Sequence, residues 1–286
     1  MASSTLSPPL LSVLSTIATK SSPATMKSFQ FSVLAALAAS QAMGHATFQQ
    51  LWINGEDQGS ACARLPASNS PVTDVSSNAL RCNANPAAAK GKCGVAAGDT
   101  VTVEMHQQPN DRSCANEAIG GNHYGPVMAY LTKVDNAATA DGSTGWYKIY
   151  EDSWTKNPSG YSGSDDFWGV KDMNKCCGLV DVPIPKDTPA GDYLLRAEVI
   201  ALHTASGVGG AQLYMTCYQL TVDGSGNASP ATVKFPGAYS AQDPGILFNM
   251  YAPVSSYQAP GPAVVSGGTT KTAGSGCTGC EASCHA

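Results

Sequence analysis

The fold is decided by the stretch Tyr193-Leu-Leu-Arg-Ala-Glu-Val-Ile-Ala-Leu-His203 and by Ala211-Gln-Leu-Tyr-Met-Thr-Cys-Tyr-Gln-Leu-Thr-Val222, which follows it after a glycine-rich turn. Apolar, aromatic and β-branched residues dominate both runs, as they do in β-strands. Glycine flanks both runs, which is typical of strand ends. The sequence therefore predicts two long strands here, the strongest in the chain.

Shorter strand patterns recur along the rest of the chain, separated by turns rich in glycine and proline. Residues 100–105 alternate between two side-chain classes with a period of two, the pattern of a half-buried strand. Residues 179–185 contain prolines, which cannot donate to an interior ladder, so we expect an edge strand there. Further strands are predicted at residues 46–53, 127–131 and 146–150.

The fold class follows from this series of strands. No amphipathic helix of three turns is visible, and residues 151–175 are expected to form a long surface loop. Several short strands joined by Gly/Pro turns indicate an all-β protein. We expect an immunoglobulin/fibronectin-like antiparallel β-sandwich with long loops and few short helices.

Composition limits the partners and the compartment. The chain of 286 residues has a formal net charge of -5, which argues against nucleic acid or an anionic membrane as a partner. Only 13% of the residues are charged, as in many secreted β-rich proteins. Ten cysteines indicate an oxidising compartment.

The N-terminal residues 1–44 have the features of an extension plus a signal peptide. Lys27 supplies a positive charge, residues 31–39 are apolar, and Ala42 and Gly44 place small residues before a cleavage point. The apolar run is shorter than the roughly 18 residues that span a bilayer. We expect a secreted protein whose signal proper covers residues 26–44, and the sequence leaves Met1 and Met26 open as the true start. Cleavage after Gly44 makes His45 the first residue.

The remaining chain divides into two regions. Residues 45–262 are predicted to form one globular domain, and the tail at 263–286 is rich in Gly, Ser and Thr and is expected to be disordered. The tail ends in Cys277, Cys280 and Cys284, a spacing that a metal site could use but that a disordered terminal stretch explains better. Asn227, in Asn-Ala-Ser, is the candidate glycosylation site.

Two histidines provide the candidate metal site. A mature N-terminal His45 carries a free α-amine and an imidazole, and His123 stands before Gly-Pro at a strand start. Two imidazoles and one amine suit Cu(II), which prefers tetragonal nitrogen sites. Gln212 and Tyr214 share one face of their strand, and His203 closes the strand before it.

These residues together resemble the fungal lytic polysaccharide monooxygenases of auxiliary activity family nine. The resemblance covers His45 to Pro262, and its motifs are specific as a set. They are His45 after a signal, His123-Tyr-Gly-Pro-Val127, Leu194-Leu-Arg-Ala-Glu198 with Ala201-Leu-His203, Gly210-Ala-Gln-Leu-Tyr214 with Cys217, Asp243-Pro-Gly-Ile246 and Tyr257-Gln-Ala-Pro-Gly-Pro262.

The resemblance implies a role for each matching residue. His45, through its amine and ring, and His123 would hold one copper ion per chain, with Tyr214 in the distant axial position. His203 and Gln212 would hydrogen-bond the oxygen reactant. His106 matches no family ligand and is expected to be structural.

The resemblance also implies positions outside the metal site. Tyr257 would lie on the flat substrate-facing surface, or else would pack within the C-terminal arm. Cys82 and Cys217 would form the core disulfide. Five other cysteines exceed the common family pattern, and their pairing stays open, including one free thiol or a bridge to the tail: Cys62, Cys93, Cys114, Cys176 and Cys177.

The implied reaction is copper-dependent oxidative cleavage of β-1,4-glucan, with cellulose as the expected substrate. Oxidation would fall at C1 or C4 beside the glycosidic bond and would use O2 or H2O2. Electrons would come from an external donor such as cellobiose dehydrogenase or a small phenolic reductant. A monomer is expected.

Two other classes of protein stay open. A carboxylate-based endo-β-1,4-glucanase would need two carboxyl groups about 5–10 Å apart across a cleft, and the available clusters are Glu151/Asp152 and Asp165/Asp166. A non-catalytic copper- or carbohydrate-binding protein would not require His203, Gln212 and Tyr214. Release of oxidised sugars only with a reductant separates all three.

Overall fold

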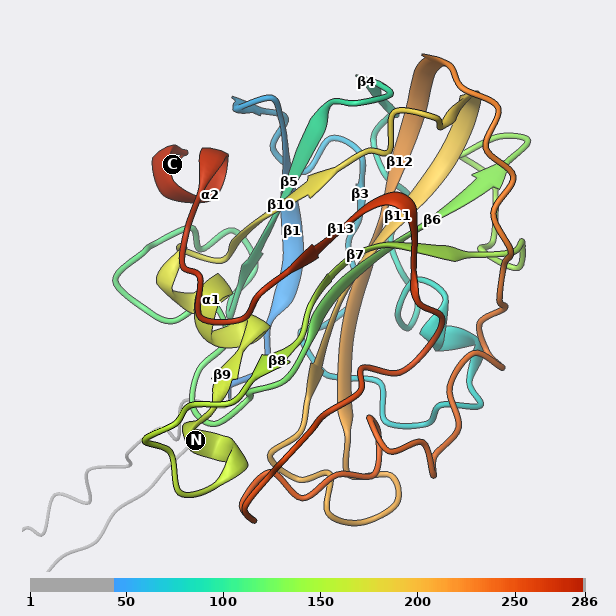
Figure 1. The fold of residues 1–286 in the computed structure, drawn as a ribbon. Helices are drawn as coiled ribbons and strands as arrows, with labels where there is room; N and C mark the ends of the chain where they lie inside the picture. Colours follow the sequence, from blue (N-terminus) through green and yellow to red (C-terminus); the bar gives the residue numbers. More distant parts are fainter. Residues whose placement is uncertain (1–43, 285–286) are drawn as a thin grey trace, which may run out of the picture. The chain divides into compact units, whose positions relative to one another are not determined.

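The computed structural model describes residues 44–284. The expected signal segment, apart from Gly44, lies outside the described residues. The described chain is a β-sandwich of two main sheets (Figure 1), which confirms the predicted fold class. Within residues 44–284 no helix is long and apolar enough to cross a membrane.

The smaller sheet has four strands in the order β10-β5-β1-β2. All of its pairs are antiparallel. The proline-containing strand β10 lies at an edge of this sheet, as predicted. The bounds are β1 (Thr47–Ile53), β2 (Glu56–Asp57), β5 (Thr100–His106) and β10 (Leu179–Pro183).

The larger sheet runs in the order β13-β7-β6-β11-β12-β3, with β4 beside β12. Its centre is the long β11/β12 ladder, which ends where Ala201 pairs with Gln212. Two pairs, β4/β12 and β7/β13, are parallel and depart from the antiparallel expectation. The bounds are β3 (Ala63–Arg64), β4 (Cys93–Ala96), β6 (Val127–Val134), β7 (Tyr147–Asp152), β11 (Pro189–Ala201), β12 (Gln212–Ser225) and β13 (Val264–Lys271).

The larger sheet is buried on both faces. One face packs on the smaller sheet around residues such as Leu131, Leu195 and Tyr218. The other face packs under the irregular arm of residues 226–263, with Leu194 and Phe235 in that second core. Because successive side chains alternate between faces, burial on both sides explains why apolar residues occur on both faces of β11 and β12, and why polar side chains such as Arg196 and Glu198 are buried there too.

Residues 151–175 do not form the long surface loop that we expected. They contain a small hairpin, a 3-10 turn and a helix beside the sandwich. Elements of two to seven residues are too short to show a periodic pattern, so the sequence gives no signal for them. They are β8 (Trp154–Thr155), η2 (Gly163–Asp165), β9 (Phe167–Trp168) and α1 (Gly169–Lys175), while η1 (Asn78–Leu80) and α2 (Gly279–Ser283) lie elsewhere.

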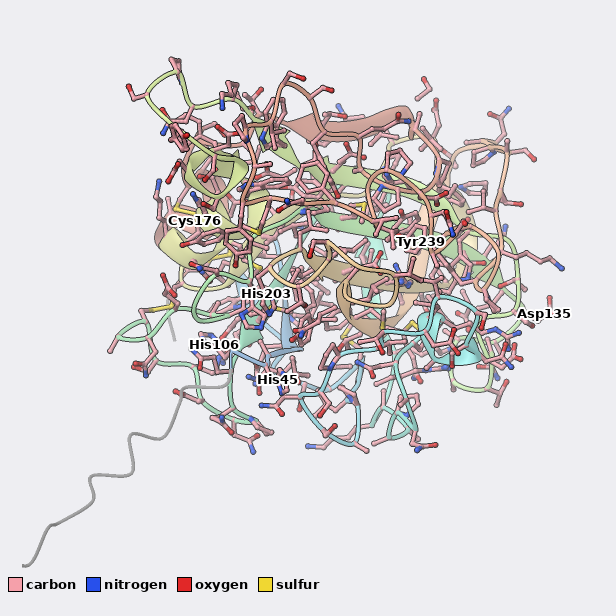
Figure 2. The ribbon with its side chains drawn as sticks, turned by 90° about the horizontal axis from the view of Figure 1, so that it is seen from below. His45, His106, Asp135, Cys176, His203 and Tyr239 are labelled. Atoms are coloured by element: carbon pink, nitrogen blue, oxygen red, sulfur yellow. A yellow bond between two sulfur atoms is a disulfide. The ribbon has the colours of Figure 1, made fainter. Side chains whose placement is uncertain are left out.

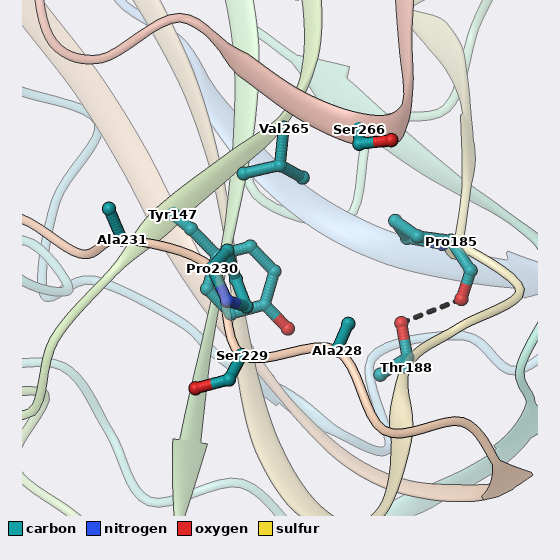
Figure 3. Close-up of a pocket in the computed structure, with 9 residues that line it drawn as sticks. All are labelled: Tyr147, Pro185, Thr188, Ala228, Ser229, Pro230, Ala231, Val265 and Ser266. Carbon is teal, nitrogen blue, oxygen red and sulfur yellow. Dashed lines mark hydrogen bonds between the residues drawn. The ribbon is translucent and has the colours of Figure 1, made fainter.

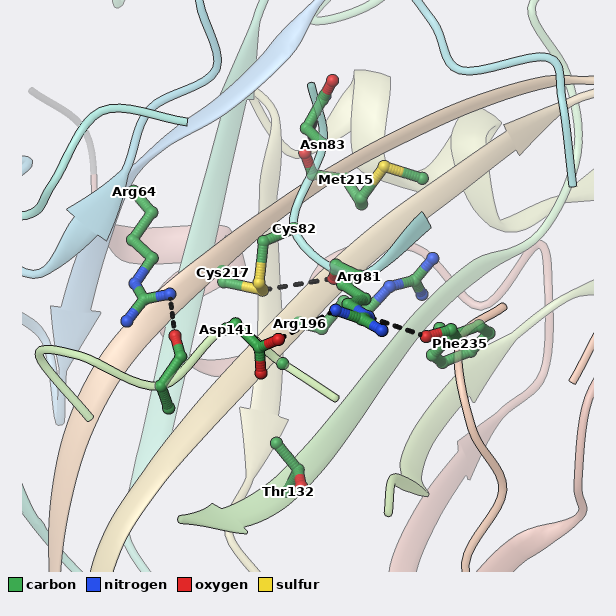
Figure 4. Close-up of a disulfide and its surroundings, with 12 residues drawn as sticks. Arg64, Arg81, Cys82, Asn83, Thr132, Asp141, Arg196, Met215, Cys217 and Phe235 are labelled. Carbon is green, nitrogen blue, oxygen red and sulfur yellow. Dashed lines mark hydrogen bonds and ion pairs between the residues drawn. A yellow bond between two sulfur atoms is a disulfide. The ribbon is translucent and has the colours of Figure 1, made fainter. Parts of the chain in front are cut away.

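All ten cysteines form disulfides, and no cysteine is free. Cys82 pairs with Cys217 beneath the second core (Figure 4). The pairs that the sequence left open are Cys62–Cys93, Cys114–Cys177, Cys176–Cys277 and Cys280–Cys284. This pattern suits an oxidising compartment.

The expectation of a disordered tail does not hold for the described residues 264–284. Strand β13 pairs in parallel with β7, and Cys277 is bonded to Cys176 next to α1. Glu281 is 2% exposed and accepts hydrogen bonds from Asp181 N at 3.0 Å and Lys271 Nζ at 2.7 Å. A ladder, a disulfide and a buried carboxylate order the tail, and none of these is visible in its Gly/Ser/Thr composition. With Cys277, Cys280 and Cys284 in disulfides, the tail offers no thiolate to a metal.

The double variant Cys176→Ser/Cys277→Ser is expected to lose about 2–4 kcal/mol of unfolding free energy. The bridge closes a sequence separation of 101 residues, and loop-closure entropy grows with loop length. Urea denaturation measures the loss, and limited proteolysis should cut the tail first. Cys280→Ser/Cys284→Ser is the matched control, because that bridge spans only 4 residues and should matter less. Equal losses in the two variants would contradict the argument.

Candidate metal centre

Loop and strand ends from four parts of the sandwich meet at one end of the larger sheet. His45 precedes β1, His123 precedes β6, and His203 follows β11 directly across the ladder end from Gln212. Figure 2 shows His45, His106 and His203 close together. The ring centroids of His123 and His203 are 4.0 Å apart. Residues far apart in sequence therefore form one polar cluster.

Tyr214 lies near both of the histidines predicted as ligands. Its ring centroid is 6.2 Å from that of His45 and 6.1 Å from that of His123. Its hydroxyl donates to Gln212 Oε1 at 2.7 Å. Burial raises the pKa of the Tyr214 phenol, so the hydroxyl stays protonated. The structure thus brings together the tyrosine and glutamine that the strand pattern put on one face.

The His123 ring is held in one orientation and one tautomer. Its Nδ1 lies 2.6 Å from the Gly120 carbonyl oxygen. A carbonyl only accepts, so Nδ1 carries the proton and Nε2 keeps a free lone pair. Burial, followed by the nearby His203 imidazole, lowers the pKa of His123 to about 4. His123 is therefore a neutral imidazole above that pH, the form in which histidine binds metals.

His203 supplies a further unpaired nitrogen. Burial, and then proximity to His45, lower the pKa of this imidazole. Its Nδ1 is buried and has no hydrogen-bond partner in the protein. Buried polar atoms usually have a partner, so this atom fits a site that receives a ligand or water.

Gly44 packs directly on the cluster in the uncleaved chain. It is buried, and a Cβ atom placed on it would lie 2.2 Å from Gly120 O and 2.5 Å from His123 Nδ1. With Gly44 attached, the nitrogen of His45 is a peptide nitrogen and a poor ligand. Removal of Gly44 would both expose the His123 side of the cluster and create a free amine.

The donor set fits copper once that amine exists. No group of three or more His, Cys, Asp or Glu side chains that could hold a metal occurs in residues 44–284. Two imidazoles and a terminal amine need no third such side chain. Nitrogen-only ligands in a small set favour Cu(II) over the harder cations that carboxylates bind.

Three further predicted positions either serve structure or lie exposed on the surface. His106 Nε2 bonds Glu104 Oε1 at 2.9 Å in a buried pair, which agrees with a structural histidine. The Tyr257 ring packs 4.9 Å from Trp168 and its hydroxyl donates to Gly245 O at 2.9 Å. This placement favours the packing role over the substrate-facing one. Asn227 is exposed on the connector after β12.

The carboxylate clusters do not form an open catalytic pair. Asp152 is 2% exposed and Asp166 is fully buried. Asp165 caps the turn η2 through the Tyr161 and Ser162 backbone amides. Glu151 pairs with Lys148 Nζ at 2.6 Å. These contacts are structural and argue against the glucanase alternative.

One cavity lies away from the histidine cluster, beside the connection that follows β12. It has a volume of about 400 Å³ and is lined by Tyr147, Pro185, Thr188, Pro230 and Val265, among others (Figure 3). Tyr147 pairs with Leu131 in β6, whereas the cluster adjoins the start of that strand. No titratable pair or free histidine lines this cavity, so the chemistry belongs to the histidine cluster.

The loop that follows His203 and two loops linked to it carry exposed apolar side chains. Among the described residues the exposed large hydrophobic ones are Tyr161 at 85%, Val208 at 63% and Tyr251 at 49%. Phe248 N bonds Ala205 O, and Gly163 N bonds Ala252 O, so the three loops that carry these residues are linked by backbone hydrogen bonds, and the loop with Val208 follows His203 directly. The sequence marks these loops only as Gly/Ser-rich, and no pattern in it indicates their exposure.

The family model described as "Auxiliary Activity family 9 (formerly GH61)" matches residues 45–258. The chain belongs to Auxiliary Activity family 9. The match begins at His45, the residue predicted to start the mature protein.

Relatives and solved structures of family 9 agree. The chain is 70% identical over 259 residues to "AA9 family lytic polysaccharide monooxygenase B" of Thermothelomyces thermophilus, covering 91% of this chain and 80% of the relative. It is 66% identical to "AA9 family lytic polysaccharide monooxygenase E" of Neurospora crassa, covering 88% and 76%. The structure "CvAA9A" matches with a TM-score of 0.68 and 31% identity, over 79% of this chain and all of that one.

Proposed function

We propose that residues 45–262 form a secreted copper monooxygenase that cleaves β-1,4-glucan, with cellulose as its substrate, by oxidation at C1 or C4. The observation that carries the proposal is the convergence of His45, His123 and Tyr214 on one point, in a member of family 9 whose match starts at His45. The names of the relatives, as lytic polysaccharide monooxygenases, support oxidative cleavage of a polysaccharide.

Three nitrogens would hold the copper ion. They are the α-amine and ring of His45 and the Nε2 atom of His123, whose other nitrogen is committed to Gly120 O. Tyr214, a neutral phenol, would be a further group close to the ion. The chemistry that bound copper supplies is one-electron redox cycling and activation of O2 or H2O2.

The neighbouring side chains would orient the oxygen reactant. Gln212 Oε1 accepts from Tyr214, which turns the amide so that Nε2 is left as a donor. His203 is half-buried and has an unpaired ring nitrogen. Two hydrogen-bonding groups on the same side of the centre would bind and steer an oxygen species and move a proton to or from it.

The substrate would dock on the exposed apolar side chains. Tyr161, Val208 and Tyr251 belong to three loops linked by hydrogen bonds, and the loop with Val208 follows His203 directly. Aromatic faces suit the apolar faces of glucose rings, and an open surface suits a crystalline polymer that cannot enter a deep cavity. These residues take the substrate-facing role that the sequence assigned to Tyr257.

The external partners would be a cellulose surface and an electron donor such as cellobiose dehydrogenase or a small phenolic reductant. Secretion is supported by the paired cysteines, which form in oxidising compartments. Asn227 would be glycosylated there, since its side chain is exposed. A monomer is expected.

Incubation of the processed chain with amorphous cellulose, copper and ascorbate tests the proposal. Oxidised oligosaccharides should appear only with reductant, and His123→Ala should lower their yield at least ~100-fold, because loss of a ligand exceeds the 10–100-fold typical of outer-shell partners. Asn122→Ala, an exposed neighbour, is the control and should be as active as wild type. Unoxidised reducing ends without reductant would indicate a hydrolase, and copper binding without product would indicate a binding protein.

A further inference from the structure

We propose that Asn174 on α1 is a positioning residue of the metal centre. Its side-chain amide holds Ile119 in place, so that the next residue, Gly120, presents its carbonyl to His123 Nδ1 and leaves Nε2 free for the metal. The inference rests on the proposed function for the identity of the metal and on the contacts of α1 for everything else.

Asn174 binds both backbone groups of one residue. Ile119 N donates to Asn174 Oδ1 at 3.1 Å, and Asn174 Nδ2 donates to Ile119 O at 3.0 Å. Ile119 itself is fully buried, so its backbone groups have little access to water. Only an amide side chain offers a donor and an acceptor side by side in this way. Asn174 thus acts as a two-point clamp on the loop.

The clamped residue adjoins the one that orients His123. Gly120 is buried and its carbonyl accepts from His123 Nδ1 at 2.6 Å. A shift of Ile119 would displace Gly120, because the Ile119 carbonyl and the Gly120 nitrogen belong to one rigid peptide plane, and the Gly120 carbonyl would move with that residue. Without the acceptor, the imidazole can place its proton on Nε2, the atom that a metal needs unprotonated.

Helix α1 contacts the chain before His123, through Asn174 and Ile119, and also after it. Val170 N donates to Gly125 O at 3.2 Å, and Lys171 Nζ lies 4.3 Å from the centroid of the Tyr124 ring. Asn174 lies three residues after Lys171, so their side chains are neighbours on the helix surface, and Val170 is four residues before Asn174. Together these three positions contact residues 119, 124 and 125, which flank the histidine.

Helix α1 is fixed by disulfides just after its last residue, close to Asn174. Cys176 and Cys177, directly after α1, bond to Cys277 in the tail and to Cys114 in the loop that leads to His123. A helix of seven residues has little stability of its own. The two bridges give it a fixed position from which Asn174 can hold the loop.

The test is made on the processed chain beginning at His45. In the metal-free protein, side-chain ¹H–¹⁵N correlation spectra should show wild-type His123 as a single Nδ1–H tautomer. In Asn174→Ala the Nε2–H tautomer should become populated, and Cu(II) affinity measured by titration should fall ~10–100-fold, the usual effect of losing an outer-shell partner. The EPR spectrum of bound Cu(II) should change as well. Asn116→Ala, an exposed asparagine in the same loop, should leave all three readouts unchanged.

A second variant guards against a folding defect. Asn174→Asp keeps the size of the side chain and the acceptor for Ile119 N, but it cannot donate to Ile119 O when ionised. It should shift the tautomer and the EPR spectrum in the same direction. If either variant folds with the His123 tautomer and EPR spectrum of wild type, Asn174 supports stability alone and the proposal is wrong. Failure of wild type to bind copper would refute the proposed function and leave the tautomer measurement standing.

Discussion

A chain that retains Gly44 in front of His45 is expected to bind Cu(II) at least ~100-fold more weakly than the chain that starts at His45, and to release no oxidised sugar. The amide nitrogen of a Gly44–His45 peptide bond has no free lone pair, so one of the three nitrogen ligands is lost. Losing a partner outside the ligand set already costs 10–100-fold in affinity. Losing a ligand must cost at least as much.

The uncleaved Gly44 also packs against the His123 ring. Gly44 is buried against His123, and a Cβ atom at position 44 would lie 2.4 Å from His123 Cε1. The backbone of the preceding residue therefore packs beside the Nδ1–Cε1 edge of the ring, next to the carbonyl that orients it. Processing would supply the amine and remove this contact, so cleavage would be the activating step.

Calorimetric copper titration of the two chains measures the difference. The control is the His45-starting chain with the exposed Asn122 changed to Ala, which should bind as wild type does. Equal affinities with and without Gly44 would show that the amine is not a ligand, and the proposed centre would then have to be abandoned.

The sequence predicts which residues belong to the candidate site. It does not predict which other residues hold them in position. His45 follows from a processing site, and Gln212 and Tyr214 from a strand alternation, which are local patterns, whereas His123 and the ligand roles come from the resemblance to the family. Asn174 could not be found in this way, because its role is a contact with a residue 55 positions earlier. The exposure of Tyr161 depends on how its loop packs, which no local pattern records.

The fold likewise has parts that local sequence patterns predict and parts that depend on long-range contacts. The two long strands and the edge strand β10 were predictable, since alternation, β-branched residues and proline act locally. The order of the tail was not, because it depends on Cys176–Cys277 and on burial of Glu281 against the smaller sheet. A Gly/Ser/Thr-rich composition favours disorder only when no disulfide or buried contact ties the segment to the rest of the domain.

The second large effect concerns the buried ion pair on β11. Glu198→Ala is expected to lower the unfolding free energy by about 3–5 kcal/mol, the cost of leaving a buried charge unpaired. Arg196 and Glu198 are both 0% exposed and are joined by two bonds of 2.6 Å. Arg196 Nε also donates to Leu80 O at 2.8 Å, in the loop that carries Cys82. The guanidinium can therefore reach water only if this hydrogen bond breaks.

The magnitude should depend on burial rather than on the loss of a carboxylate. Asp141→Ala is the matched control, because its pair with Arg81 has a side chain 67% exposed and should be worth less than about 1 kcal/mol. Urea denaturation with the disulfides intact measures both variants. The double variant Arg196→Met/Glu198→Leu should regain most of the loss, since it removes both charges.

Copper affinity separates this effect from the metal centre. Val199 pairs with Tyr214 across the ladder, so Glu198 points to the opposite face of the sheet from the site. Folded Glu198→Ala should therefore bind copper as wild type does while unfolding at lower urea. A loss below 1 kcal/mol would mean that water or a neighbouring tyrosine such as Tyr239, which donates to Glu198 Oε2, compensates the arginine. A parallel loss of copper affinity would mean instead that the second core and the histidine cluster are coupled through β11 and β12.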